Sequence, residues 1–117
     1  MVAKSGGGEA EVTWSASGYI PLVNNVPLTN RMLPSLKRAV GEANVLETKP
    51  ITASEDFSFF AQKVPSFYFF IGVTPEGTML TKAAPNHSPR FFVDEAALPT
   101  ALRALVYVAF DYAQTGK

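Results

Sequence analysis

Cysteine is absent from the 117-residue chain, and histidine occurs only once, at position 87. Without a thiol the chain can form no disulfide bond, no thiolate zinc site and no cysteine nucleophile. With one imidazole it also lacks the paired-histidine motifs that fix the geometry of many catalytic zinc sites. Any metal or hydrolytic chemistry at His87 therefore needs partners of another residue type or from outside the chain.

An excess of charge is also missing, because ten basic residues balance ten acidic ones. A neutral chain has no electrostatic footprint for nucleic acid or for an anionic membrane, so we expect neither as a partner. No run approaches the roughly 20 apolar residues of a membrane-spanning helix. The N-terminal stretch MVAKSGGGEAEV lacks the apolar region of a signal peptide. We therefore expect a soluble protein in the cytoplasm.

The composition that is present is ordinary for a globular protein, with 47% hydrophobic and 17% charged residues. This balance and the length predict one compact domain that buries roughly two-thirds of its unfolded surface. Residues 1–8 contain a run of glycines and are expected to form a flexible lead-in.

Hydrophobic periodicity predicts strands that alternate with helices. Residues 9–16 alternate in polarity, which indicates a strand with Ala10, Val12, Trp14 and Ala16 on its buried face. NVLE at 44–47 is a candidate short strand, and FYFFIGV at 67–73 has the composition of a strand buried on both faces. This order favours an α/β fold, in which helices flank a partial sheet.

Three helices are predicted around these strands. The first spans about residues 27–40, starts at Asn24, Asn25 or Thr29 as N-cap and ends at Gly41. Pro34 should kink it or delay its start. The second starts at Ser54 as N-cap and ends before Pro65. The third starts near Asp94 or Glu95, and one apolar face carries Leu98, Leu102, Leu105, Val106 and Ala109.

A long loop at 74–90 carries His87 between Pro85 and Pro89, which should stiffen it. Loops of this length are often functional, and α/β sheets bind ligands beyond the carboxyl ends of their strands. Imidazole is also a common ligand of zinc and similar ions. A histidine without a chemical role and a catalytic or metal-binding histidine both fit these features.

Partners for His87 would have to be carboxylates, because a metal site needs three or four protein ligands. Glu55, Asp56 and Asp94 are the candidates. The pair Glu55–Asp56 could act as acid or base, or could simply favour the start of a helix. None of four serines lies in the sequence context of an activated nucleophile: Ser54, Ser58, Ser66 and Ser88.

Asn24 and Asn25 form a second candidate pair. Their amides could hydrogen-bond a substrate, or they could serve only as turn and cap residues.

Two stretches, ASEDFSFFAQKVPSFYFFIGV and NHSPRFFVDEAALPTALRALVYVA, resemble the C-terminal end of the M20 family of metal-dependent amidohydrolases and peptidases. The similar subgroup contains hippurate hydrolases, N-acyl-amino-acid amidohydrolases and indole-acetyl-amino-acid hydrolases. The resemblance covers residues 9–114. It implies that residues 9–24 correspond to the end of the family's dimerisation domain and its return segment, and that residues 25–117 correspond to the C-terminal part of the catalytic domain.

The resemblance implies that His87 is one ligand of a dinuclear site for a divalent metal, zinc or manganese, and that Glu55 and Asp56 lie near the active site. In the complete enzyme, a metal-activated water would attack the amide carbonyl of an N-acyl amino acid or small peptide. The general base and the remaining ligands belong to an N-terminal half that these residues do not match. The resemblance therefore implies a hydrolase fragment that is inactive alone and binds no metal tightly.

Two alternatives stay open. The chain could be a non-catalytic α/β module that forms a homo-oligomer or assembles with a missing N-terminal half, because a half cut from its partner exposes apolar faces. It could also be an independent small hydrolase that uses His87 with Glu55 or Asp56.

Overall fold

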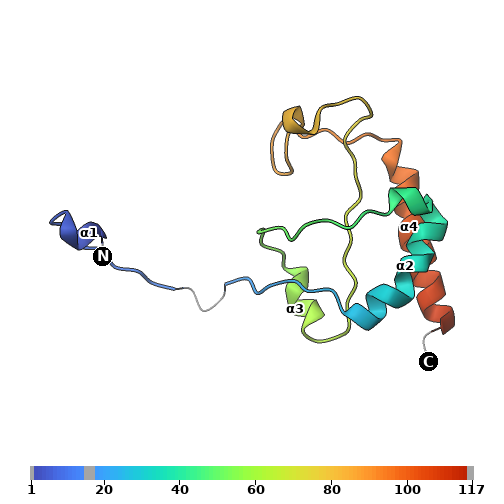
Figure 1. Ribbon diagram of the computed structural model, residues 1–117, viewed down its shortest axis with the longest axis horizontal. Helices are drawn as coiled ribbons and strands as arrows, with labels where there is room; N and C mark the ends of the chain where they lie inside the picture. Colours follow the sequence, from blue (N-terminus) through green and yellow to red (C-terminus); the bar gives the residue numbers. More distant parts are fainter. Residues whose placement is uncertain (1, 15–17, 116–117) are drawn as a thin grey trace.

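The computed structural model describes residues 2–14 and 18–115 of the chain. Its helices are α1 (Val2–Ser5), α2 (Val26–Val40), α3 (Phe57–Ala61) and α4 (Ala97–Thr115), with 3₁₀ turns η1 (Glu42–Asn44) and η2 (Leu80–Lys82). Figure 1 shows α2 and α4 side by side, the irregular segments and α3 to one side of this pair, and the N-terminal segment extending away from the rest. None of the helices in the described ranges is both long and apolar enough to cross a lipid bilayer.

The α/β fold with a partial sheet flanked by helices is a wrong prediction, since no residue in the described ranges belongs to a β-strand. Along residues 9–14 the side chains are exposed, and Trp14 is 91% exposed. Ala16 lies outside the described residues, and Asn44 belongs to η1. Alternating polarity shows only which face of a strand would be buried. A sheet also needs a neighbouring strand to receive the backbone hydrogen bonds.

The segment 66–73 comes closest to the predicted buried strand. It runs without helical structure from α3 to the loop that carries η2 (Figure 1). Its backbone bonds to isolated residues rather than to a strand: Asn25 N–H donates to Ser66 O at 2.9 Å, and Asp94 N–H donates to Val73 O at 2.8 Å. Phe70 is 61% exposed, so the segment is not buried on both faces.

Helix α2 follows the sequence prediction closely. Asn25 is its N-cap, and the side-chain oxygen of Asn25 accepts from Leu28 N–H at 3.0 Å. Gly41 ends the helix with φ of 88°, a conformation that glycine adopts without steric cost. The helix continues through Pro34 and starts eight residues before it, so the expected delay is wrong. Pro34 is exposed, which keeps its ring away from the contact with α4.

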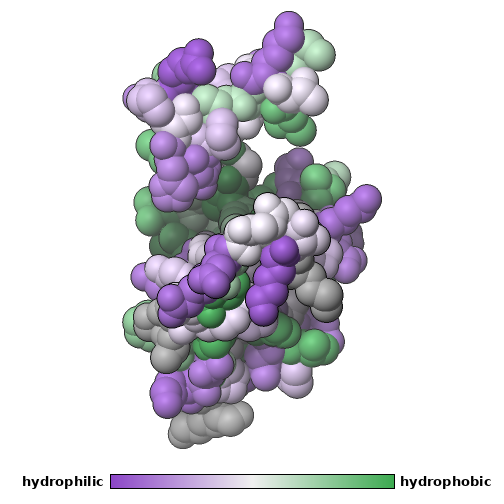
Figure 2. All heavy atoms as spheres, turned by 90° about the vertical axis from the view of Figure 1, so that its left-hand side faces the viewer, coloured by the Kyte–Doolittle hydropathy of each residue, from purple (hydrophilic) through white to green (hydrophobic). Residues whose placement is uncertain are grey.

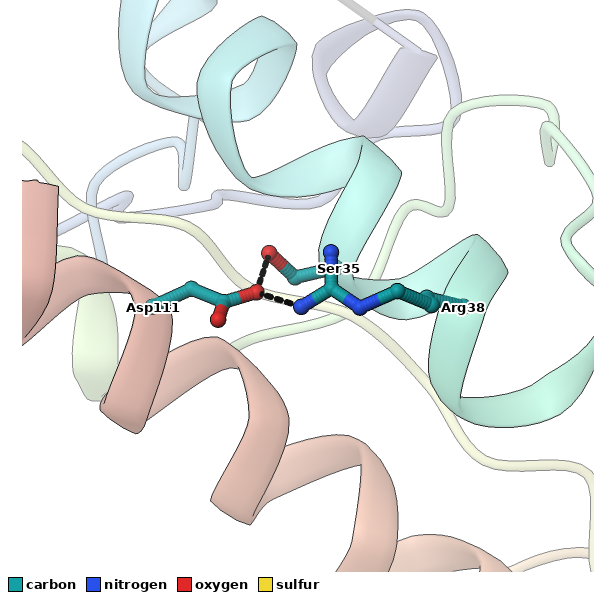
Figure 3. A network of polar contacts seen from close by, with 3 residues as sticks. All are labelled: Ser35, Arg38 and Asp111. Atoms are coloured by element: carbon teal, nitrogen blue, oxygen red, sulfur yellow. Dashed lines mark hydrogen bonds and ion pairs between the residues drawn. The ribbon is translucent and has the colours of Figure 1, made fainter.

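The contact between α2 and α4 contains the buried hydrophobic side chains Met32, Leu36, Ala39 and Ala104. Polar groups also cross it. Asp111 on α4 accepts a hydrogen bond from the Ser35 hydroxyl at 2.5 Å and forms an ion pair with Arg38, as Figure 3 shows. The hydrogen bond from Ser35, followed by that from Arg38, holds the pKa of the Asp111 carboxyl below its usual value.

Helix α4 contacts α2 through Ala104 and through larger side chains such as Tyr107, whose ring lies beneath the Arg38 guanidinium. Ala104 is fully buried, whereas the predicted apolar face is mainly exposed. Leu98, Leu102, Leu105 and Val106 are each more than half exposed. The sequence correctly predicted a helix with one apolar face, but that face does not contact α2.

The compact domain expected from the length is not observed. The radius of gyration is 19.4 Å, whereas a compact domain of this length has about 13 Å. The accessible surface is 10152 Å², against about 6,200 Å² for a compact protein of this size. Figure 2 shows hydrophobic residues at the surface, among hydrophilic ones. Much apolar surface therefore stays in contact with solvent.

Candidate active-site segment

Glu55 lies two residues before the first residue of α3, and the hydrogen bonds at the start of this helix explain its position. Phe57 N–H donates to Glu55 Oε1 at 3.1 Å, and the Ser58 hydroxyl donates to Glu55 O at 2.6 Å. The predicted cap at Ser54 is wrong, because the helix starts at Phe57 with Asp56 as the preceding residue. Glu55 thus accepts the hydrogen bond of the Phe57 amide, one of the amides at a helix start that have no partner within the helix.

The second oxygen of Glu55 binds a tyrosine from the segment 66–73. The Tyr68 hydroxyl donates to Glu55 Oε2 at 3.0 Å. Both residues are half-buried. The carboxylate therefore accepts a hydrogen bond on each oxygen, one from the backbone and one from a side chain 13 residues away.

These contacts shift the acidity of both groups. The hydrogen bond from Phe57 N–H, then that from the Tyr68 hydroxyl and that from Asp56, hold the pKa of the Glu55 carboxyl below its usual value. The Glu55 carboxylate in turn raises the pKa of the Tyr68 phenol. Hydrogen bonds to the ionised form of a carboxyl favour that form, so Glu55 is a carboxylate at neutral pH.

Asn24 binds the same tyrosine through its backbone. Asn24 Nδ2 donates to Tyr68 O at 2.8 Å, and Tyr68 N–H donates to Asn24 Oδ1 at 2.8 Å. One side-chain amide thereby makes the two hydrogen bonds that a facing residue would make in an antiparallel ladder. Asn25, as described above, caps α2.

An open hollow of about 540 Å³ lies between residues 23–27 and residues 61–65 and includes both asparagines in its lining. It includes neither His87 nor the Glu55–Asp56 pair. The substrate-binding role of Asn24 and Asn25 stays a prediction.

His87 belongs to the loop that follows the segment 66–73. Its side chain is exposed, and its φ of 68° makes it the only non-glycine residue with positive φ among the described residues. A left-handed backbone at a residue other than glycine costs roughly 1–2 kcal/mol. Ser88 N–H donates to Pro85 O at 3.2 Å and closes a turn around His87.

Figure 1 shows the loop with η2 and helix α3 at opposite ends of the segment 66–73. The structure therefore connects Asn24, Tyr68 and Glu55 but does not bring His87 to them. The described residues contain no group of three or more histidine and carboxylate side chains that could hold a metal ion. Because a zinc-type site takes three or four protein ligands, this part of the chain does not by itself fit a complete metal site. His87 as a metal ligand stays a prediction.

Sequence reasoning missed Tyr68. It lies in FYFFIGV, whose composition predicts a strand buried on both faces and gives no separate role to the tyrosine. The available signal was its hydroxyl, because a half-buried tyrosine usually finds a hydrogen-bond partner.

Comparisons with known proteins settle the family. The family model described as peptidase family M20/M25/M40 matches residues 3–111 of the chain. The chain therefore belongs to this family, which confirms the resemblance found in the sequence. Enzymes of the M20 family are generally metal-dependent.

Individual relatives cover nearly the whole chain. It is 35% identical over 106 residues to thermostable carboxypeptidase 2 of Saccharolobus solfataricus, and 30% identical over 106 residues to N-acetyldiaminopimelate deacetylase of Lacticaseibacillus paracasei; both matches cover 91% of the chain and 26% of the relative. It is 29% identical over 92 residues to IAA-amino acid hydrolase ILR1-like 2 of Arabidopsis thaliana, covering 79% of the chain and 20% of the relative. The chain thus spans between a fifth and about a quarter of the length of these relatives. No solved structure matches it.

Proposed function

We propose that the chain supplies the part of a metal-dependent amidohydrolase that contains His87, and that the whole enzyme hydrolyses the amide bond of N-acyl amino acids or small peptides. Membership in the M20 family supports the amidohydrolase class. The names of two relatives, a deacetylase of N-acetyldiaminopimelate and a hydrolase of IAA-amino acids, describe substrates with an acyl group joined to an amino acid. A bound metal would polarise the amide carbonyl of the substrate and would activate a water molecule as the nucleophile.

The observation that carries this proposal is the exposure and the backbone conformation of His87. It is an exposed imidazole on a proline-flanked turn, held in a left-handed conformation, and the described residues provide no cluster of ligands around it. A strained conformation at an exposed loop residue supports a functional role. We therefore expect the other ligands and the general base to come from residues outside these 117, and the isolated chain to be inactive.

A chimera tests this proposal directly. Residues 9–114 replace the matching quarter of Saccharolobus carboxypeptidase 2, and the purified chimera is measured for bound zinc or manganese and for hydrolysis of N-acyl amino acids and peptides. We expect metal binding and hydrolysis in the chimera and their loss, by at least tenfold, in the chimera with His87→Ala. Asn86→Ala, next to His87 and exposed, is the control and should keep both.

Calorimetry of the isolated chain with zinc chloride or manganese chloride gives the complementary result. We expect no tight binding, because one imidazole provides too few ligands. Tight, stoichiometric binding by the isolated chain would contradict the incomplete site. Equal metal content in the chimera and in its His87→Ala variant would contradict the ligand role.

A second candidate function is a non-catalytic module that assembles with itself or with a partner chain. The specific observation is the exposed apolar face of α4, where Leu102 and Leu105 are 64% and 59% exposed. Patches of this kind mark interaction surfaces. We expect light scattering on the purified chain to show association that Leu102→Gln with Leu105→Gln weakens. A strict monomer at high concentration, together with hydrolysis by the chimera, would leave the first function alone.

A further inference from the structure

A continuous set of hydrogen bonds leads from Asn24 through Tyr68 to Glu55. The Asn24 amide holds the backbone of Tyr68 through two bonds of 2.8 Å. The Tyr68 hydroxyl then reaches Glu55 Oε2 at 3.0 Å. These bonds join residues 44 and 13 positions apart, so they result from tertiary structure and not from local chain geometry.

The ring of Tyr68 is also fixed by its neighbours. Its centroid lies 5.6 Å from that of Phe57 and 5.3 Å from that of Phe70, the latter in an edge-on arrangement. Contacts of this geometry between aromatic rings are favourable and directional. The phenol is therefore oriented at its base by an amide and along its ring by two phenylalanines before it meets the carboxylate.

We propose that Tyr68 is a positioning residue for the Glu55 carboxylate and that Asn24 is a positioning residue for Tyr68. In this arrangement Glu55 is held in one orientation as an ionised acceptor, with one oxygen bonded to Phe57 N–H and the other to the Tyr68 hydroxyl. Asn24 thereby acts through the protein backbone rather than through a contact with substrate. The inference rests on the proposed function for its catalytic meaning, because Glu55 belongs to the acidic pair that the family resemblance places near the active site.

The first test uses the whole 117-residue chain without metal or substrate. Carbon-13 NMR follows the Glu55 carboxyl carbon through a pH titration in the native sequence and in Tyr68→Phe, which keeps the ring and removes the hydroxyl. The proposal expects the Glu55 pKa to rise toward its usual value in Tyr68→Phe. It stays partly lowered, because the bond from Phe57 N–H remains.

Tyr19→Phe is the matched control. Tyr19 is 59% exposed and also contacts a phenylalanine ring, Phe59, at 6.2 Å, so the variant makes the same chemical change at a tyrosine other than the one that bonds to Glu55. The proposal expects no change in the Glu55 titration. A Glu55 pKa that moves equally in both variants, or in neither, overturns the role of Tyr68.

Asn24→Ala tests the second step, with Asn30→Ala as control because Asn30 is exposed on α2. The proposal expects Asn24→Ala to shift the Glu55 pKa in the same direction as Tyr68→Phe and to weaken the nuclear Overhauser contacts between the Tyr68 ring and the Glu55 side chain. Asn30→Ala should leave both unchanged. A Glu55 titration unaffected by Asn24→Ala overturns the role of Asn24.

If Tyr68→Phe fails to fold, the pKa of the Tyr68 phenol can be measured instead. In the native chain the Tyr68 phenol must titrate above the usual range of tyrosine, and Glu55→Gln must lower its pKa. A Tyr68 phenol that titrates normally in the native chain overturns the proposal. Because no arm uses metal or hydrolysis, this outcome is distinguishable from failure of the proposed function, which the chimera alone decides.

Discussion

The helix pair α2–α4 and the segment 45–96 differ in how they are held together. The helix pair satisfies its backbone internally, buries Met32, Leu36, Ala39 and Ala104, and adds the contacts of Asp111 with Ser35 and Arg38. The segment 45–96 contains the candidate active-site residues. Its regular structure is limited to α3 and η2.

The two regions differ in where their backbone groups find hydrogen-bond partners. A helix makes its own hydrogen bonds, so α2 and α4 need only each other to bury one face. An extended segment needs a neighbouring segment to bond its backbone groups. In segment 66–73, isolated residues such as Asn24 and Asp94 provide these hydrogen bonds. The segment that contains the candidate site residues is thus less regular than the helix pair.

The largest expected effect tests the helix pair. Met32→Ala removes a side chain that is 2% exposed, and the cavity should lower the free energy of unfolding by about 2–3 kcal/mol. Urea unfolding followed by far-ultraviolet circular dichroism measures it. Met79→Ala, the same change at a residue that is 61% exposed in the segment 45–96, should have little effect. Equal losses would remove the distinction between the two regions.

The next effect concerns the polar contact in the same interface. Ser35 is 3% exposed and donates to Asp111, so Ser35→Ala should lower the free energy of unfolding by about 1 kcal/mol. Ser54→Ala, at an exposed serine in the segment 45–96, is the control and should be neutral. A neutral Ser35→Ala would show that the contact orients the helices without stabilising them.

Acid should weaken the helix pair through Asp111. Its pKa is lowered in the folded state by the bonds from Ser35 and Arg38, so its stabilising effect is present above the unfolded pKa and is lost as pH falls through the folded pKa. Urea midpoints measured at decreasing pH should therefore fall more in the native chain than in Asp111→Asn. Parallel profiles in the two proteins would exclude this linkage.

A smaller effect is expected at His87, in the irregular segment 45–96. The backbone φ at position 87 is 68°, a value at which a β-branched side chain is strained. His87→Val should therefore lower the free energy of opening the turn by about 1 kcal/mol. That change corresponds to a roughly fivefold faster exchange of the Ser88 amide hydrogen. His87→Gly fits the conformation and should change the exchange less. Identical exchange in both variants would show that the loop does not hold this conformation.

Several features could be predicted from local sequence. Asn25 and Gly41 bound α2 as their cap chemistry requires, and the apolar spacing of the last helix predicted α4. The motif around His87 led to the M20 family. In the candidate site, Glu55 and Asn24 were identified by residue type, but their mutual connection through Tyr68 was not, because it joins positions 44 and 13 apart.

Local sequence was enough to predict the two long helices, both ends of α2 and the family, because each depends on residues within a few positions of one another or on a linear motif. Helix α4 starts at Ala97, shortly after the predicted start near Asp94 or Glu95. Long-range contacts settled three other features. No described segment pairs into a sheet, the leucines of α4 are exposed to solvent, and Tyr68 bridges Asn24 and Glu55. The physical reason is that periodicity records which side chains avoid water, whereas pairing, facing and bridging depend on what lies opposite in space.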